Sequence, residues 1–254
     1  MLLTVALAAV LAVGCASTTS TTAATKTLND ASAGTYSGIG VGLCQGINES
    51  MGGWAETGDL SGGVSGLNAK SAGVKAADVT GPDSDGYYRV VESTKEVTIL
   101  GTVEYSADIY IKLVTNEAGK YEHVYVYGTY SYSVTTSSGS VSYTMTFGSG
   151  KSDPYHGTAT WSGADLVSIA ATGPLSFGIS VSSGTESHTV AMAFTIDSFS
   201  IPVTSEEDYP TGKFTLSVTY DGATQPTMTV TFDGDATAVF AYGDYTTTIS
   251  VPGA

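Results

Sequence analysis

Residues 97–113 read VTILGTVEYSADIYIKL, and this stretch decides the fold. Apolar and polar side chains alternate through it, so that one face is apolar and the other carries Thr, Glu, Ser, Asp and Lys. A period of two is typical of a half-buried β-strand. Seventeen residues greatly exceed a usual strand of about five or six, and Gly101 offers a place to bend. We therefore predict a sheet of long strands. The apolar face comprises Val97, Ile99, Val103, Tyr105, Ala107, Ile109, Ile111 and Leu113.

The same period continues toward the C-terminus. Asn116–Gly119 and Ser138-Gly139 predict turns, as does Ser183-Gly184. VTYDG at 218–222 recurs as VTFDG at 230–234, and each copy runs a strand into an Asp-Gly turn. A slip of the apolar phase predicts a bulge near Asp197. About eleven strands are expected in total. Besides 97–113 they cover 121–135, 141–147, 158–161, 166–170, 175–181, 190–196, 218–220, 230–232, 236–242 and 245–251.

These segments predict an all-β, antiparallel meander of long strands. Both a two-sheet sandwich and a curved open barrel fit the pattern. At most one short helix is expected, at 42–54, where Leu43, Ile47, Met51 and Trp54 recur at helical spacing. The chain after residue 33 is expected to form a single β-rich domain, 34–254. It divides into a Gly-rich segment, 34–86, and the antiparallel sheet, 87–254.

The first fifteen residues carry a different signal. Residues 1–13 are apolar apart from Thr4, and Gly14 then precedes Cys15. The apolar run is too short to span a bilayer and suits a signal peptide. The ending LAVGC at 11–15 resembles the lipobox of bacterial lipoprotein signal peptides. The alternative is an ordinary secretory signal cleaved near Gly14 or Ala16, with Cys15 unmodified.

The lipobox resemblance implies cleavage between Gly14 and Cys15 and acylation of Cys15. Residues 1–14 are then the signal peptide. Residues 15–33, rich in Ser, Thr and Ala, read as a tether. The protein is expected to be exported and lipid-anchored to the bacterial cell envelope, at the outer membrane if the source is Gram-negative. Its membrane contact would be the N-terminal lipid.

Composition and charge exclude several functions. The chain has a net charge of −15 and one arginine, so nucleic acid is not an expected partner. The three histidines, at 123, 156 and 188, show no metal-ligand spacing along the sequence. No nucleophile motif or cofactor fingerprint is present, so we expect neither an enzyme nor a bound cofactor.

Two groups of residues are candidate sites. Tyr121, Tyr125 and Tyr127 share one face of a predicted strand and form a possible contact face for a glycan or a protein. Asp83 and Asp85 lie in a segment that starts like a calcium loop but lacks the remaining ligands, which makes them weak calcium candidates. Asp and Gly also favour plain turns.

The sequence favours a lipid-anchored envelope protein that displays a non-catalytic β-rich binding or structural module. The alternative is a carrier that holds a lipid or another apolar ligand in the cavity of a curved sheet. The two differ in the fate of apolar residues such as Ile109, Ile111, Met145 and Phe147. In a packed module they fill a core, and in a carrier they line a cavity.

Overall fold

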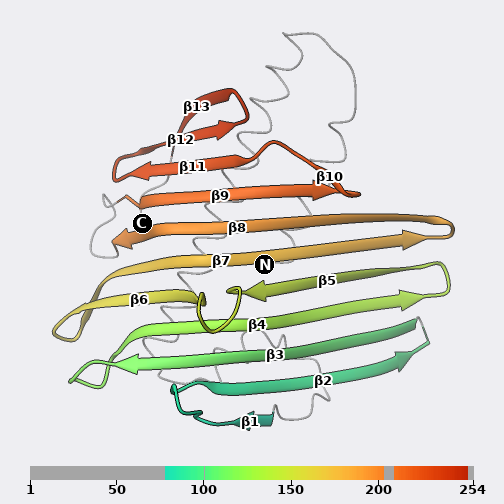
Figure 1. The fold of residues 1–254 in the computed structure, drawn as a ribbon, viewed down its shortest axis with the longest axis horizontal. Coiled ribbons are helices and arrows are strands. Elements are labelled where there is room, and N and C mark those ends of the chain that lie inside the picture. Colours follow the sequence, from blue (N-terminus) through green and yellow to red (C-terminus); the bar gives the residue numbers. More distant parts are fainter. Residues whose placement is uncertain (1–77, 100, 203–208, 251–254) are drawn as a thin grey trace.

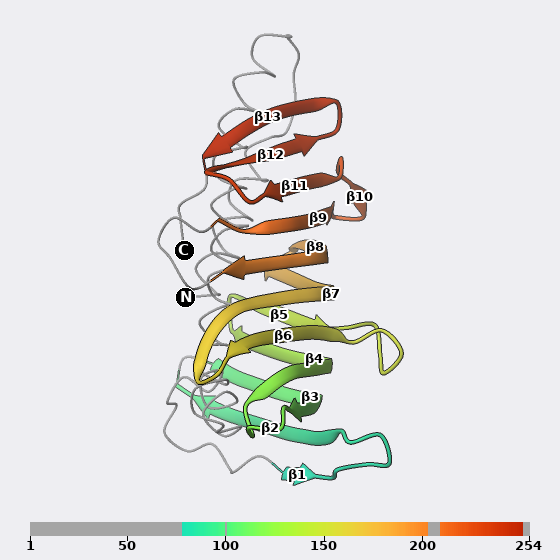
Figure 2. The same ribbon diagram turned by 90° about the vertical axis from the view of Figure 1, so that its left-hand side faces the viewer.

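The computed structural model describes residues 78–99, 101–202 and 209–250. This part of the chain is all-β, as predicted, and its thirteen strands belong to one antiparallel sheet (Figure 1). Seen from the side, the strands lie in a single twisted layer (Figure 2). The described strands therefore do not form the two-sheet sandwich that the sequence allowed. They form one continuous sheet, as the other alternative, the curved open barrel, requires.

The strands follow one another along the sheet almost in chain order, so the fold is a meander. They are β1 (Asp78–Thr80), β2 (Tyr88–Thr98), β3 (Gly101–Thr115), β4 (Tyr121–Thr136), β5 (Gly139–Phe147), β6 (Tyr155–Ser162), β7 (Asp165–Ser183), β8 (Glu186–Pro202), β9 (Thr211–Tyr220), β10 (Ala223–Thr224), β11 (Met228–Asp233), β12 (Thr237–Tyr242) and β13 (Tyr245–Ser250).

One position in the sheet is shared by two strands. β5 and β6 both lie between β4 and β7, end to end (Figure 1). Phe147, the last residue of β5, pairs with Gly128, and Tyr155, the first of β6, pairs with Val126. β5 and β6 therefore act as one long strand, interrupted by a loop at 148–154. The interruption brings β6 beside the first half of β4.

The two faces of the sheet differ in chemistry because side chains alternate along each strand. One face is apolar, and its buried residues form a single cluster that spans β2 to β12. The cluster includes Ile109, Ile111 and Met145, and Phe147 packs against it partly buried. The opposite face, called here the polar face, carries Ser and Thr in cross-strand pairs such as Ser106 with Ser131, whose hydroxyls lie 2.7 Å apart.

Several turns and bulges are placed where the sequence predicts them. Asp221-Gly222 joins β9 to β10, and both residues have positive φ, as a tight hairpin turn requires. The register of β8 against β9 shifts between Asp197 and Ser200, which confirms the predicted bulge. Gly128 has φ 127°, and a Cβ there would lie 2.2 Å from the Asp108 carbonyl oxygen, so β3 and β4 approach closely at this position.

Several strand predictions are wrong in their bounds; 218–220, for example, covers only the last three residues of β9, and in two places the division into strands is wrong as well. Residues 97–113 are not one strand: β2 ends at Thr98, β3 begins at Gly101, and the two pair as a hairpin. The side chains of Val97 and Ile99 are exposed. Val97 lies near the end of β2, and Ile99 lies in the turn that follows it. Conversely, 166–170 and 175–181 belong to one strand, β7, which passes the Gly173-Pro174 pair through a register shift.

Several other predictions concern residues outside the described part of the chain. They are the signal peptide 1–14 with Gly14 and Cys15, the tether 15–33, the helix at 42–54 and the Gly-rich segment up to residue 77. The described residues contain no helix with the length and hydropathy needed to cross a membrane.

Candidate functional site

Two rows of aromatic and cationic side chains cross the polar face. The first row joins Arg89, Tyr110 and Tyr127, which are directly opposite one another on β2, β3 and β4. The Tyr110 and Tyr127 rings stack with centroids 4.5 Å apart and planes 5° from parallel. The Arg89 guanidinium lies 5.5 Å from the Tyr110 centroid. Directly opposed residues on neighbouring strands have close Cβ atoms, which explains the stack.

The second row runs beside the first. It joins Lys112, Tyr125 and His156 on β3, β4 and β6, again opposite one another. The Tyr125 and His156 rings stack at 4.2 Å with planes 5° from parallel. The Lys112 ammonium lies 5.7 Å from the Tyr125 centroid. Each row therefore has a cation at one end, followed by two stacked rings.

The stacking distances fix how the rings stand on the sheet. Neighbouring strands are about 4.8 Å apart, close to the two centroid distances, so the rings stack along the direction of the backbone hydrogen bonds. Their planes then stand upright on the sheet, and their edges point to solvent. The two flat faces of Tyr110 and of Tyr125 are already in contact with a neighbouring ring on one side and a cation on the other. A ligand approaching from solvent meets ring edges, hydroxyls and charges rather than an open aromatic face.

Charge is balanced within the first row by an exposed ion pair. Arg89 donates two hydrogen bonds to Asp108, from Nε to Oδ1 at 2.8 Å and from Nη2 to Oδ2 at 2.7 Å. The hydrogen bonds and charge of Asp108 raise the pKa of Arg89, and the same contact lowers the pKa of Asp108. Arg89 is thereby held in the orientation that places it over Tyr110.

Tyr87 joins the two rows. Its ring meets Tyr127 edge to face at 5.1 Å and lies within reach of Lys112 and Lys151, whose ammonium groups are 5.8 and 5.6 Å from its centroid. Tyr87 is 6% exposed, and this burial is the main cause that raises its pKa. The rows and Tyr87 together are called the aromatic–cation patch below. It comprises Tyr87, Arg89, Tyr110, Lys112, Tyr125, Tyr127 and His156.

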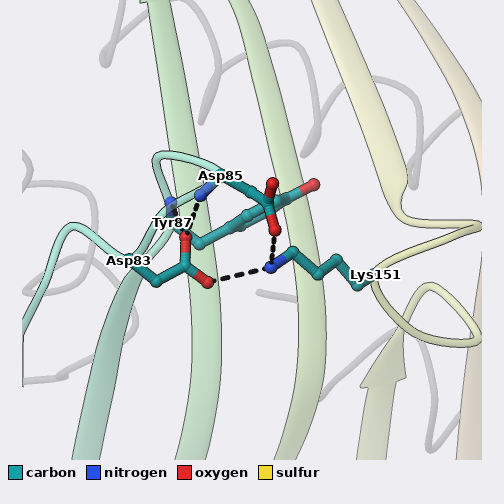
Figure 3. A network of polar contacts seen from close by, with 4 residues as sticks. All are labelled: Asp83, Asp85, Tyr87 and Lys151. Carbon is teal, nitrogen blue, oxygen red and sulfur yellow. Dashed lines mark hydrogen bonds and ion pairs between the residues drawn. The ribbon is translucent and has the colours of Figure 1, made fainter.

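Lys151 reaches the patch from the 148–154 loop. Its ammonium bridges the carboxylates of Asp83, at 3.0 Å, and Asp85, as Figure 3 shows. Asp83 Oδ1 also accepts the backbone N–H groups of Asp85 and Tyr87, both at 2.9 Å. The bond from Tyr87, followed by that from Lys151, lowers the pKa of Asp83 to about 2. This contact ties the turn before β2 to the loop between β5 and β6.

The bridge also bears on calcium binding. A calcium ion would need the oxygens of Asp83 and Asp85 that Lys151 already contacts, and it would meet the ammonium charge. The geometry thus favours the interpretation of this segment as a turn. Among the described residues, no three His, Cys, Asp or Glu side chains form a group that could hold a metal ion.

The structure separates the three predicted tyrosines. Tyr125 and Tyr127 both belong to the aromatic–cation patch. Tyr121 lies beyond a register shift at the start of β4, and its carbonyl accepts a hydrogen bond from Trp161 Nε1 at 2.9 Å. Sequence reasoning missed Arg89, Tyr110, Lys112 and His156. The alternation within 97–113 put Lys112 on the polar side and left Tyr110 unassigned. The neighbours of both residues depend on the β2–β3 hairpin and on the position of β6, which the alternation does not show.

Tyr110 and Lys112 in fact share the polar face, because both are even-numbered positions of β3. The tyrosine in the 97–113 pattern that faces the apolar side is Tyr105. Its hydroxyl donates to Glu92 Oε2 at 3.1 Å, and Glu92, 5% exposed, keeps its other carboxylate oxygen without a hydrogen-bond partner. Burial is the main cause that raises the pKa of Tyr105. Tyr105 and Glu92 therefore form a polar pair on the otherwise apolar, buried face of the sheet.

The polar face is also hollowed beyond the patch. A shallow open depression of about 430 Å³ lies over β2 to β5, where the side chains are small. Hydroxyls of Ser106, Ser131 and Thr144 line it, with the Lys95–Glu104 ion pair at one end. It offers hydrogen-bonding groups to a ligand.

No family model matches this chain, and no significant match was found among the curated proteins or the solved structures.

Proposed function

We propose that this chain is a lipid-anchored cell-envelope protein that displays a non-catalytic β-rich module for binding. The aromatic–cation patch is the observation that carries the binding role. It gathers Arg89 and Lys112 with four tyrosines on one face of the sheet, and Lys151 reaches it from a separate loop. The proposed anchor rests on the lipobox-like ending at Gly14-Cys15.

The chemistry of the patch favours a protein partner. The ring faces of Tyr110 and Tyr125 are in contact with their neighbours, so little flat surface is left for a sugar ring. Tyrosine and arginine, both present in the patch, are enriched in protein interfaces. The patch is also held in place by its own stacks and ion pairs, which lowers the ordering cost of binding.

The binding proposal is tested with the soluble chain, in which Cys15→Ser removes the site of acylation. Binding to envelope fractions of the source bacterium is measured with and without prior protease treatment of those fractions. The double change Tyr125→Ser and Tyr127→Ser should reduce binding at least tenfold. Tyr88→Ser, an exposed tyrosine outside the patch, should leave it unchanged. Equal binding by the double variant would refute the role of the patch, and binding that survives protease would refute a protein partner.

The anchor is tested separately by cell fractionation and mass spectrometry. The wild-type chain should sediment with membranes and carry the mass of a lipid on Cys15, and Cys15→Ser should release it. A wild-type chain without lipid mass would contradict the anchor. The binding assay would still stand, since it uses the unlipidated chain.

One observation favours the alternative, a carrier of lipid or another apolar ligand. The described strands form a single layer whose apolar face runs from β2 to β12. Its side chains are buried, so a carrier would need them to line an internal cavity that an acyl chain could enter. Organic extraction of the purified Cys15→Ser chain followed by mass spectrometry should then recover one lipid per chain, whereas an empty chain would leave the binding module as the function.

A further inference from the structure

His123 and His156 meet on the polar face, although 33 residues separate them in the sequence. His123 lies on β4 and His156 on β6, two positions apart in register, since His123 pairs with Thr158 and Tyr125 with His156. His123 Nδ1 and His156 Nε2 are 3.2 Å apart. The Thr158 hydroxyl lies 3.5 Å from the first nitrogen and 3.4 Å from the second.

These three atoms form a nearly equilateral triangle with sides of 3.2, 3.4 and 3.5 Å. A tetrahedral zinc site with metal–nitrogen bonds of about 2.05 Å places its donors about 3.3 Å from one another. The triangle therefore has the size of one face of a tetrahedron around a metal ion. The two imidazole planes are 39° apart, and the fourth position of the tetrahedron is left for water.

We propose that His123, His156 and Thr158 form a binding site for a divalent transition metal of the zinc, copper and nickel class. Imidazole nitrogen is a ligand that these ions favour. The two histidines supply the strong bonds, and the Thr158 hydroxyl binds the ion weakly or orients its water. This site shares His156 with the aromatic–cation patch, but its argument rests neither on the proposed binding function nor on the lipid anchor.

The surroundings keep the site ready for an ion. The Tyr125 ring stacks on His156 at 4.2 Å and fixes the ring plane. Lys112 lies beyond the other side of Tyr125, because β3 and β6 flank β4. The net charge of −15 favours the approach of a cation.

The test uses the full chain with Cys15→Ser and Cys44→Ser, so that no thiol contributes. Titration with zinc chloride in a calorimeter should give one ion per chain. His123→Ala and His156→Ala should each weaken binding at least tenfold, and Thr158→Val should weaken it severalfold. His188→Ala removes the one remaining histidine of the chain and should leave the affinity unchanged. The proposal is overturned if zinc binds the two histidine variants as tightly as the parent.

A second measurement does not depend on the variants folding. The electron paramagnetic resonance spectrum of the Cu²⁺-loaded parent chain should show hyperfine coupling to two imidazole nitrogens. Coupling to no nitrogen, or loss of the coupling only in His188→Ala, would refute the site. Far-ultraviolet circular dichroism of each variant establishes whether the sheet is retained.

Discussion

Gly128 lies on β4, next to the point where β4 stops pairing with β6 and begins to pair with β5. Its replacement by alanine should be strongly destabilising. A Cβ there would lie 2.2 Å from the Asp108 carbonyl oxygen and 2.8 Å from the Ile109 Cα. Both are backbone atoms, so the clash is relieved only if β3 and β4 move apart. The backbone conformation, with φ 127°, is also one that alanine adopts only with strain.

The cost can be worked from these two effects. An unfavourable φ costs about 1–3 kcal/mol. Separation of the strands weakens one or two ladder hydrogen bonds, each worth about 0.5–1.5 kcal/mol. The sum is about 1.5–6 kcal/mol, which for a domain of this size lowers Tm by roughly 3–24 °C. Thermal and urea unfolding followed by circular dichroism would measure it.

Gly178 provides a matched control. It lies within β7, has no positive φ, and a Cβ there would meet nothing within 4 Å. Gly178→Ala should therefore leave stability unchanged or raise it by up to about 1 kcal/mol, because alanine restricts the unfolded chain. If Gly128→Ala loses less than 1 kcal/mol relative to Gly178→Ala, the close approach of β3 and β4 is refuted.

Three further outcomes are expected. Phe240→Ala should cost about 3–5 kcal/mol in the free energy of unfolding, because the side chain is 1% exposed within the apolar cluster; a loss under 1 kcal/mol would contradict that packing. Asp221 raises the pKa of His188, so this histidine stabilises the fold most below about pH 6 and loses that effect as pH rises through its folded-state pKa. The stability difference between wild type and His188→Ala should thus be larger at about pH 5 than at about pH 8, and the opposite trend would count against the ion pair. Lys151→Met should raise the pKa of Asp83 toward its ordinary value in a carboxylate titration followed by NMR, and an unchanged pKa would show that the Tyr87 N–H alone sets it.

The sequence predicted the fold class because alternation and turn residues are local signals. Asp221-Gly222 marks its hairpin by residues that accept positive φ. The first hairpin was missed since Ile99-Leu100 contains no turn residue, and its apolar side chains prolong the alternation. β7 was divided in two because Gly173-Pro174 reads as a break, whereas the structure passes it with a register shift.

The candidate site was harder to predict because it depends on pairing between strands. Alternation along β4 placed Tyr125 and Tyr127 on one face, and that part was readable. Nothing in the sequence shows that β5 and β6 lie end to end along the same edge of β4. That placement brings His156 next to Tyr125 and His123, so neither the second row nor the histidine pair could be found from spacing.

The loop at 148–154 opens in the middle of the sheet rather than at its edge. β5 and β6 are each held on both sides by β4 and β7, so the registers of the two halves do not depend on the length of the chain between them. Doubling a loop costs only about 0.6 kcal/mol in closure entropy. The loop near Ser152 is thus a site where a peptide or a whole domain can be inserted without disturbing the strand order. A segment inserted there would lie over the polar face, beside the aromatic–cation patch.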